Sequence, residues 1–251
     1  MVLKFLDPLE LSNSTPANRI MEFSGEKEYK EILKEQVEIA KENIDFNTFF
    51  LNENTSKLMI GPNLPPPIIA EIVNCPEKNN QAIIRKIKHY IESGADVIDI
   101  GCVANKKYPE RIKEIINLIR NNFDVLISID SMDKSEILAA VDEGVDLILS
   151  FDLGNYKNFL SIPRDIPIVI LPTNIKSAYF PKEPEVRVKN LFKLTQELRQ
   201  EGFKKLIADP LLETPIVPGI CNSLEAYFLY KKQVLKEENK KLELPLFFGI
   251  S

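Results

Sequence analysis

The chain has 251 residues, of which 44% are hydrophobic and 27% charged, a composition typical of a globular protein with a sizeable core. A net charge of -5 and a pI near 5.2 argue against a nucleic-acid backbone or an anionic membrane surface as the main partner. No apolar run approaches the roughly 20 residues of a membrane-spanning helix, and the N-terminus lacks the apolar stretch of a signal peptide. We therefore expect a cytoplasmic protein.

The histidine and cysteine content restricts the chemistry. The only histidine, His89, lies in a helical pattern, so neither a Ser-His-Asp triad nor a multi-histidine metal site can be built around it. Cys75, Cys102 and Cys221 form no CxxC motif, and their odd number is typical of reduced thiols. Any chemistry is expected to use Asp, Asn, Ser or Lys side chains.

Residues 1–63 are expected to form a separate N-terminal segment that is helical and extended. The charged stretch over 25–44, rich in Glu and Lys, predicts a helix, and "VLKFL" and "KLMIG" are candidate extended segments. The proline run over 62–67, "PNLPPP", indicates a linker. The expected domains are therefore 1–63 and 64–251.

From residue 68 onward, apolar β-rich runs alternate with amphipathic helical patterns, which predicts parallel pairing of the strands. Gly94, Gly144 and Gly202 each stand where a helix ends just before a strand, as left-handed C-terminal glycines do. Strands are predicted to begin near residues 68, 97, 125, 147, 166, 205 and 245. Helices are predicted over 82–91, 111–119, 136–141, 188–198 and 223–235.

Strands made almost entirely of Val, Ile and Leu must be covered on both faces, which leaves a doubly wound sheet or a (β/α)8 barrel. The loop after the first strand, "NCPEKNN", contains no glycine, whereas a dinucleotide fold requires G-x-G-x-x-G there. The pattern therefore favours an α/β fold of the TIM type, a (β/α)8 barrel of parallel strands. With seven predicted strands, this barrel stops after strand seven and carries an N-terminal attachment.

Polar residues end several of the predicted strands, at the edge where a parallel barrel binds its ligand. Alternation along a strand predicts that Ser128 shares a side with Asp130, that Ile207 shares one with Asp209, and that Ile72 shares one with Asn74. If all three sides face inward, two carboxylates and an amide surround one cavity. That set suits a hydrogen-bonding heterocycle better than a zinc ion.

The strand ends, taken in order, resemble those of the pterin-binding barrels, namely dihydropteroate synthase and the methyltetrahydropterin-dependent methyltransferases. The resemblance covers residues 68–251 and is closest to archaeal proteins related to dihydropteroate synthase. "GADVIDIG" and "ISIDS" are its more specific motifs. The motifs that carry it are "IVNCPE", "GADVIDIGCVANKKYPE", "LISIDS", "GVDLILSFD", "IPIVILP", "KKLIADP" and "LPLFFGIS".

The resemblance implies a pterin pocket in which the Asp209 carboxylate accepts the ring N–H and the exocyclic amine, while Asp130 holds the opposite side of the ring. It also implies that Asn74 helps to bind Mg2+ together with a substrate diphosphate. Lys106 stands where the family has an arginine, and Ser150 follows Leu149 where the family has an asparagine. Ser251 is a further candidate for substrate binding.

Three functions remain open on these grounds. The first, in folate or methanopterin biosynthesis, condenses a hydroxymethylpterin diphosphate with an aminobenzoate-type amine. The second transfers a methyl group from a reduced pterin and requires a corrinoid protein as partner; it is favoured because "DPLLETPIVPG" replaces the glycine-rich loop of the synthases. The third is a non-catalytic pterin-binding or scaffold subunit. A homodimer stays open, and no catalytic residue is assigned.

Overall fold

The computed structural model describes residues 26–45, 47–55, 57–61, 64–213 and 220–249. The chain divides into two compact units, Met1–Ile44 and Asp45–Ser251. In the first unit the described element is helix α3 (Glu26–Lys41), which confirms the predicted charged helix. The candidate strand "VLKFL" lies outside the described residues.

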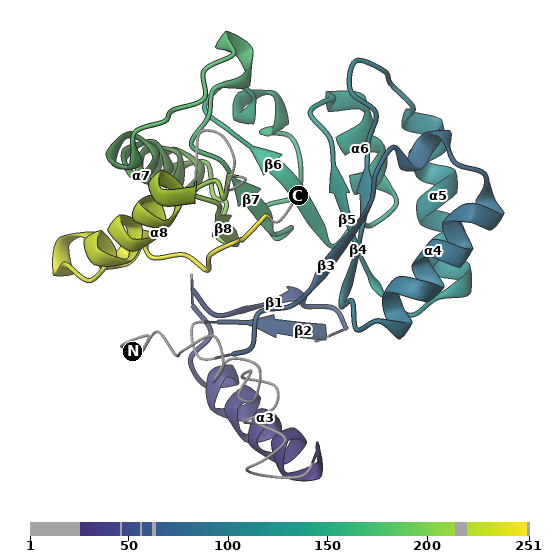
Figure 1. Cartoon of the computed structure of the whole chain (residues 1–251), viewed down its shortest axis with the longest axis horizontal. Coiled ribbons are helices and arrows are strands. Elements are labelled where there is room, and N and C mark those ends of the chain that lie inside the picture. The colour runs from purple at the N-terminus through teal and green to yellow at the C-terminus, as the bar shows by residue number, and fades with distance from the viewer. Residues whose placement is uncertain (1–25, 46, 56, 62–63, 214–219, 250–251) are drawn as a thin grey trace. The chain divides into compact units, whose positions relative to one another are not determined.

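The second unit contains a parallel sheet of six strands whose order in space follows their order in the chain (Figure 1). A seventh position follows, where Leu246 forms a parallel bridge with Ala208. All seven predicted strand positions are thereby confirmed, the last as a bridge. The six strands are β3 (Ile69–Ile72), β4 (Val97–Gly101), β5 (Leu126–Asp130), β6 (Leu147–Phe151), β7 (Ile168–Ile170) and β8 (Leu206–Ala208).

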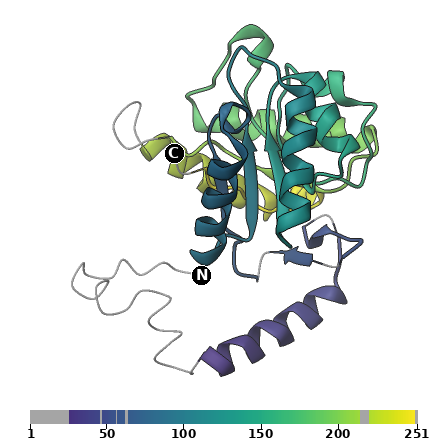
Figure 2. The same ribbon diagram turned by 90° about the vertical axis from the view of Figure 1, so that its right-hand side faces the viewer.

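Five helices connect these strands and cover the outside of the curved sheet (Figures 1 and 2). Gly94, Gly144 and Gly202 have φ values of +95°, +76° and +93°, so each provides the left-handed residue that ends a helix. Between β6 and β7 the connection holds only the short helix η2 (Tyr156–Phe159). The five helices are α4 (Asn80–Glu92), α5 (Pro109–Asn122), α6 (Lys134–Asp142), α7 (Pro184–Gln200) and α8 (Ile220–Val234).

The strands alternate between two cores. Residues such as Ile98, Ile127 and Ile129 point outward and pack against the helices. Inward-facing residues such as Val97 and Leu126 pack on the other side of the sheet, called the barrel interior below. Among the described residues no strand pairing joins Leu246 to β3, so the sheet does not close. None of the helices that the structure describes is long and apolar enough to cross a membrane. The strand and helix pattern together establish the predicted α/β fold of parallel strands.

An antiparallel hairpin of β1 (Phe49–Asn52) and β2 (Lys57–Ile60) fills the interior at the amino ends of the strands. Polar contacts hold it there, including one of 2.5 Å from Asn52 Nδ2 to Asp146 Oδ1 and an ion pair of 2.8 Å between Lys205 and Glu53. The hairpin belongs to the same unit as the sheet, whereas the sequence predicted a domain boundary between residues 63 and 64. Its apolar side chains pack against the first inward residues of the strands: Phe49, Leu51 and Ile60 against Val97, Leu126, Leu147, Val169 and Ile207.

Candidate functional site

The hairpin packs at the amino ends of the strands. The opposite edge, formed by the carboxyl ends of the strands and called the mouth below, is where parallel α/β barrels bind their ligands. The inward side chains of β5 become more polar and more exposed toward the carboxyl end of the strand. Leu126 packs in the apolar interior, Ser128 is buried next to it, and Asp130 is exposed at the rim. Strand β8 follows the same course, from Ile207 in the interior to Asp209 just beyond the strand end. The predicted alternation on these two strands is therefore what the structure has.

Three carboxylates gather at one side of the mouth. Glu71 of β3, Asp99 of β4 and Asp130 of β5 each place an oxygen within 4.8 Å of the other two. Strand register explains this, because Glu71 pairs with Asp99 and Gly101 pairs with Asp130. A side chain at residue 101 would collide with the Glu71 carboxylate, so the glycine allows Glu71 to lean over β4.

The cluster has unusual protonation behaviour. Asp99 is 3% exposed, and its burial raises its pKa to about 8. The hydrogen bond of 2.6 Å that Ser128 Oγ donates to Asp99 Oδ1 opposes this rise in pKa. The negative charges of Asp130 and Glu71 add to the rise. Although Asp130 reaches solvent at the rim, the surrounding protein partly desolvates its carboxylate, and this effect, followed by the Glu71 charge, raises the pKa of Asp130 to about 6. Near neutral pH the cluster therefore holds a proton that it can share with a ligand. Its oxygens suit either a hydrogen-bond donor or a hard cation.

Asp209, directly after the end of β8, forms a second acidic position at the mouth. Its side chain is 7% exposed, and Oδ1 accepts hydrogen bonds from the Leu211 amide at 2.8 Å and from the Tyr227 hydroxyl at 3.0 Å. Burial raises the pKa of Asp209 to about 6, and these two hydrogen bonds and the charge of Arg187 moderate the rise. The carboxylate is thus held in one orientation.

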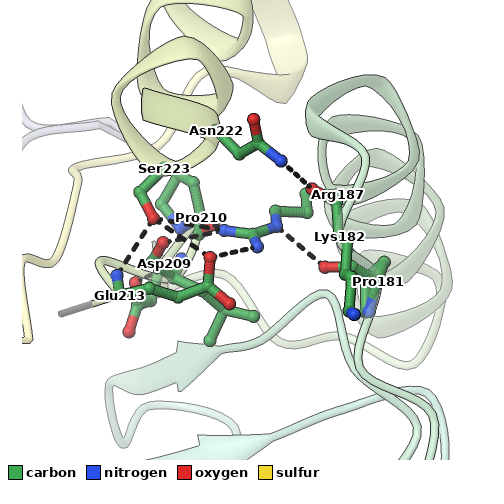
Figure 3. A network of polar contacts seen from close by, with 9 residues as sticks. Pro181, Lys182, Arg187, Asp209, Pro210, Glu213, Asn222 and Ser223 are labelled. Atoms are coloured by element: carbon green, nitrogen blue, oxygen red, sulfur yellow. Dashed lines mark hydrogen bonds and ion pairs between the residues drawn. The ribbon is translucent and has the colours of Figure 1, made fainter. Parts of the chain in front are cut away.

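A buried arginine contacts residues 210–213, which directly follow Asp209 (Figure 3). Arg187 of α7 is 0% exposed and forms an ion pair of 2.7 Å with Glu213. It also donates to the carbonyl oxygens of Pro181 at 2.9 Å and Leu211 at 3.0 Å. These contacts tie Leu211 and Glu213 to α7, at the start of the segment "DPLLETPIVPG" that stands where the family resemblance implies a glycine-rich loop.

Two of the predicted binding residues lie in the loops above β3 and β4. Asn74 is exposed, has a left-handed backbone (φ 50°) and leads into the short helix η1 (Cys75–Glu77) without capping it through its side chain. Lys106 is exposed, and its Nζ lies 2.5 Å from Glu77 Oε1, to which Tyr108 also donates. Lys106 therefore links the two loops through a surface ion pair.

Ser150 lies at an irregularity of β6. Leu149 points into the barrel and Phe151 points outward, and the register with β7 shifts between Ile148 and Phe151. The Ser150 carbonyl accepts a hydrogen bond of 3.2 Å from Asn155 Nδ2. Ser251 lies outside the described residues.

The structure thus brings Asp130 together with Glu71 and Asp99, and Asp209 together with Tyr227. Within the described part of the chain, no hydrogen bond or ion pair joins these two groups. The expectation that Ile72 and Asn74 face inward is wrong for Ile72, which packs in the outer core. The inward residue of that strand is Glu71, because Glu71 is the one registered with Asp99.

Sequence reasoning missed Glu71, Asp99 and Tyr227. A charge inside an apolar strand could have indicated the first two, since "IIAEIV" and "VIDIG" each place one acid among branched apolar residues. Tyr227 carried no such indication, because it lies in an ordinary helical pattern.

Comparisons with known protein sequences agree with this geometry. A family model described as "Pterin binding enzyme" matches residues 74–251. A protein of Methanocaldococcus jannaschii whose function is uncharacterized is 33% identical over 254 residues, covering 100% of this chain and 46% of its own. A dihydropteroate synthase of Streptococcus pyogenes is 27% identical over 111 residues, 39% of this chain and 42% of its own. The chain spans about half the length of these relatives, or less.

Solved structures show the same fold. A Yersinia pestis dihydropteroate synthase in complex with a sulfonamide drug is 18% identical with a TM-score of 0.54, and 75% of each chain is covered. A Coxiella burnetii dihydropteroate synthase in complex with pteroic acid is 21% identical with a TM-score of 0.52, and the match covers 80% of this chain and 77% of that one. Both similarities concern the fold.

Proposed function

Since the chain belongs to the family of pterin-binding enzymes, we propose that it binds a pterin at the mouth of the barrel, between Asp130 and Asp209. The observation that supports this most directly is the pair of inward carboxylates at the carboxyl ends of β5 and β8, each with its pKa raised to about 6. A pterin offers a ring N–H beside an exocyclic amine, and a carboxylate is the acceptor that fits such an edge.

In this proposal each acid has a separate role. Asp209, held by Leu211 and Tyr227, accepts hydrogen bonds from the donor edge of the ring. Asp130, with Glu71 and Asp99 beside it, contacts the opposite side of the ring system. The apolar residues below, including Leu149, exclude water from the underside of the ring.

The finer proposal is a condensation of a hydroxymethylpterin diphosphate with an aminobenzoate-type amine, in folate or methanopterin biosynthesis. The amine nitrogen forms a bond to the pterin methylene carbon as the bond to the diphosphate oxygen breaks, and the amine gives up a proton. Asp130 and Asp209 hold the ring in place and favour the positive charge that develops on it. Dihydropteroate synthases among the relatives and solved structures support this choice.

Mg2+ fits this proposal as a companion of the diphosphate. The Asn74 side chain is exposed at the rim and does not cap the helix that follows, so its amide oxygen is available as a ligand. When bound, Mg2+ neutralises charge on the leaving diphosphate. Lys106 adds a second positive charge in the neighbouring loop, provided that its ion pair with Glu77 opens.

An assay of the full chain tests the reaction. Incubation with hydroxymethyldihydropterin diphosphate, p-aminobenzoate and Mg2+ is expected to give dihydropteroate and diphosphate. Asp130→Asn is expected to reduce the rate, whereas Asp165→Asn, a change at an exposed loop residue before β7, is expected to leave it unchanged. Pterin binding without any product would refute the condensation and leave the binding function standing.

One observation favours methyl transfer from a reduced pterin as a second candidate. The segment after β8 reads "DPLLETPIVPG" where the synthases have a glycine-rich loop, and its residue Glu213 is paired with the buried Arg187. A corrinoid protein would then act as the partner. Copurification with a cobalamin protein would support this candidate, and its absence together with product formation in the assay above would refute it.

A further inference from the structure

Tyr227 stands at the junction between Asp209 and the last described segment of the chain. Its hydroxyl lies 3.0 Å from Asp209 Oδ1 and 2.6 Å from the carbonyl oxygen of Phe247. A phenol has one proton to donate, so it can serve only one of these acceptors at a time. Tyr227 is 7% exposed, and its ring stacks on the ring of Phe248 with the two centroids 4.6 Å apart. This packing holds the hydroxyl in place.

The two oxygens of Asp209 are not equivalent. Oδ1 already accepts from the Leu211 amide and from Tyr227, which together fill its acceptor positions. Oδ2 accepts no hydrogen bond from any residue in the described ranges, and a Cβ on Gly249 would lie 3.8 Å from it. Oδ2 is therefore the oxygen that is left to accept a hydrogen bond from a ligand.

We propose that Tyr227 is a positioning residue for pterin binding: its hydroxyl holds Asp209 Oδ1 and so presents Oδ2 to the N–H groups of the ligand. The inference deepens the proposed function and rests on it. Ionised Asp209 draws the Tyr227 proton toward Oδ1, and neutral Asp209 releases it to the Phe247 carbonyl. The protonation state of Asp209 therefore determines whether the Tyr227 hydroxyl donates to Asp209 or to the backbone carbonyl of Phe247.

The charged and titratable groups around Asp209 are few, so the contribution of Tyr227 can be isolated. Arg187 acts from α7 and Tyr227 from α8, and both favour the ionised carboxylate over the neutral one. Arg187 also donates hydrogen bonds to five acceptors other than Asp209, namely Pro181, Pro210, Leu211, Glu213 and Ser223. Loss of the Tyr227 hydroxyl leaves that network intact.

The test compares Tyr227→Phe with Tyr230→Phe. Tyr230 lies on the same helix, is 0% exposed and donates to the Leu242 carbonyl at 2.9 Å, so its variant removes a buried hydroxyl away from Asp209. Titration with 6-hydroxymethylpterin at pH 7 is expected to show affinity about three- to tenfold weaker in Tyr227→Phe and unchanged in Tyr230→Phe. The pH midpoint of binding is expected to rise by about half a unit or more only in Tyr227→Phe.

Equal affinity and an equal pH midpoint in wild type and Tyr227→Phe would overturn the proposal. A measurement without ligand tests the role of Tyr227 separately from the proposed function. The carboxyl carbon of Asp209, followed by NMR, should titrate at a higher pH in Tyr227→Phe than in the wild type. If no pterin binds to the wild type, the proposed function fails and this titration alone decides the role of Tyr227. If Tyr227→Phe does not fold, 3-fluorotyrosine at position 227, a stronger donor, should lower the midpoint, and an unchanged midpoint would overturn the proposal.

Discussion

Asp99→Asn is expected to stabilise the protein increasingly as the pH rises. The pKa of Asp99 is about 8 in the folded protein against an ordinary value of 3.8, so between about pH 4 and pH 8 the unfolded chain is ionised here while the folded protein keeps its proton. Each pH unit in this window lowers the free energy of unfolding of the wild type by about 1.4 kcal/mol through this one group. The full window amounts to several kcal/mol.

The asparagine keeps the shape of the side chain and can still accept from Ser128 Oγ, but it does not titrate. Its amide also points donors at Glu71 and Asp130, which relieves the repulsion between carboxylates. The advantage of the variant over the wild type should therefore grow by several kcal/mol between pH 5 and pH 9.

Urea unfolding followed by circular dichroism at pH 5, 7 and 9 measures this difference. Gln81→Ala, a change at an exposed position of α4 that involves no titratable group, provides the control, because its free-energy difference from wild type should stay constant with pH. A constant difference for Asp99→Asn as well would show that Asp99 is ionised in the folded protein at neutral pH, and the account of the carboxylate cluster would be wrong.

Three further outcomes are expected. Asp152→Asn should destabilise the fold by about 1–3 kcal/mol in thermal or urea unfolding, because the buried carboxylate accepts four hydrogen bonds that join the loops after β6 and β7; no loss would contradict this. Phe49→Ala should cost about 3–5 kcal/mol, since Phe49 is 2% exposed in the inner core, and a cost below 1 kcal/mol would show that the hairpin does not seal the barrel. Pterin affinity, measured by calorimetry, should fall about tenfold from pH 7 to pH 5 as Asp209, with a pKa of about 6, takes up a proton; a flat profile would exclude an ionised acceptor.

Much of the fold could be predicted because its elements are encoded locally. The helix-ending glycines and the apolar strands each leave a pattern that depends on neighbours within one turn or one strand. Asp133 is an example: it caps α6, with Oδ1 accepting from the Ser135 amide at 2.8 Å, and an aspartate directly before an apolar helical pattern is a local signal of such a cap. The positions of Asp130 and Asp209 at strand ends followed from the same local patterns.

What could not be predicted depends on contacts between distant segments. The inward face of β3 is set by its register with β4, so the sequence of β3 alone did not distinguish Glu71 from Ile72. The hairpin enters the barrel because of apolar contacts with five strands, which no short window of sequence contains. Tyr227 of α8 contacts Asp209 although 18 residues separate the two in the chain, a contact that no local pattern contains.

A crystal structure with bound 6-hydroxymethylpterin tests the central claim most directly. The ring is expected at the carboxyl ends of the strands, with its donor edge within hydrogen-bond distance of Asp209 Oδ2 and its other side facing Asp130. A pterin bound elsewhere on the molecule, or bound at the mouth with its donor edge turned away from Asp209, would contradict the account.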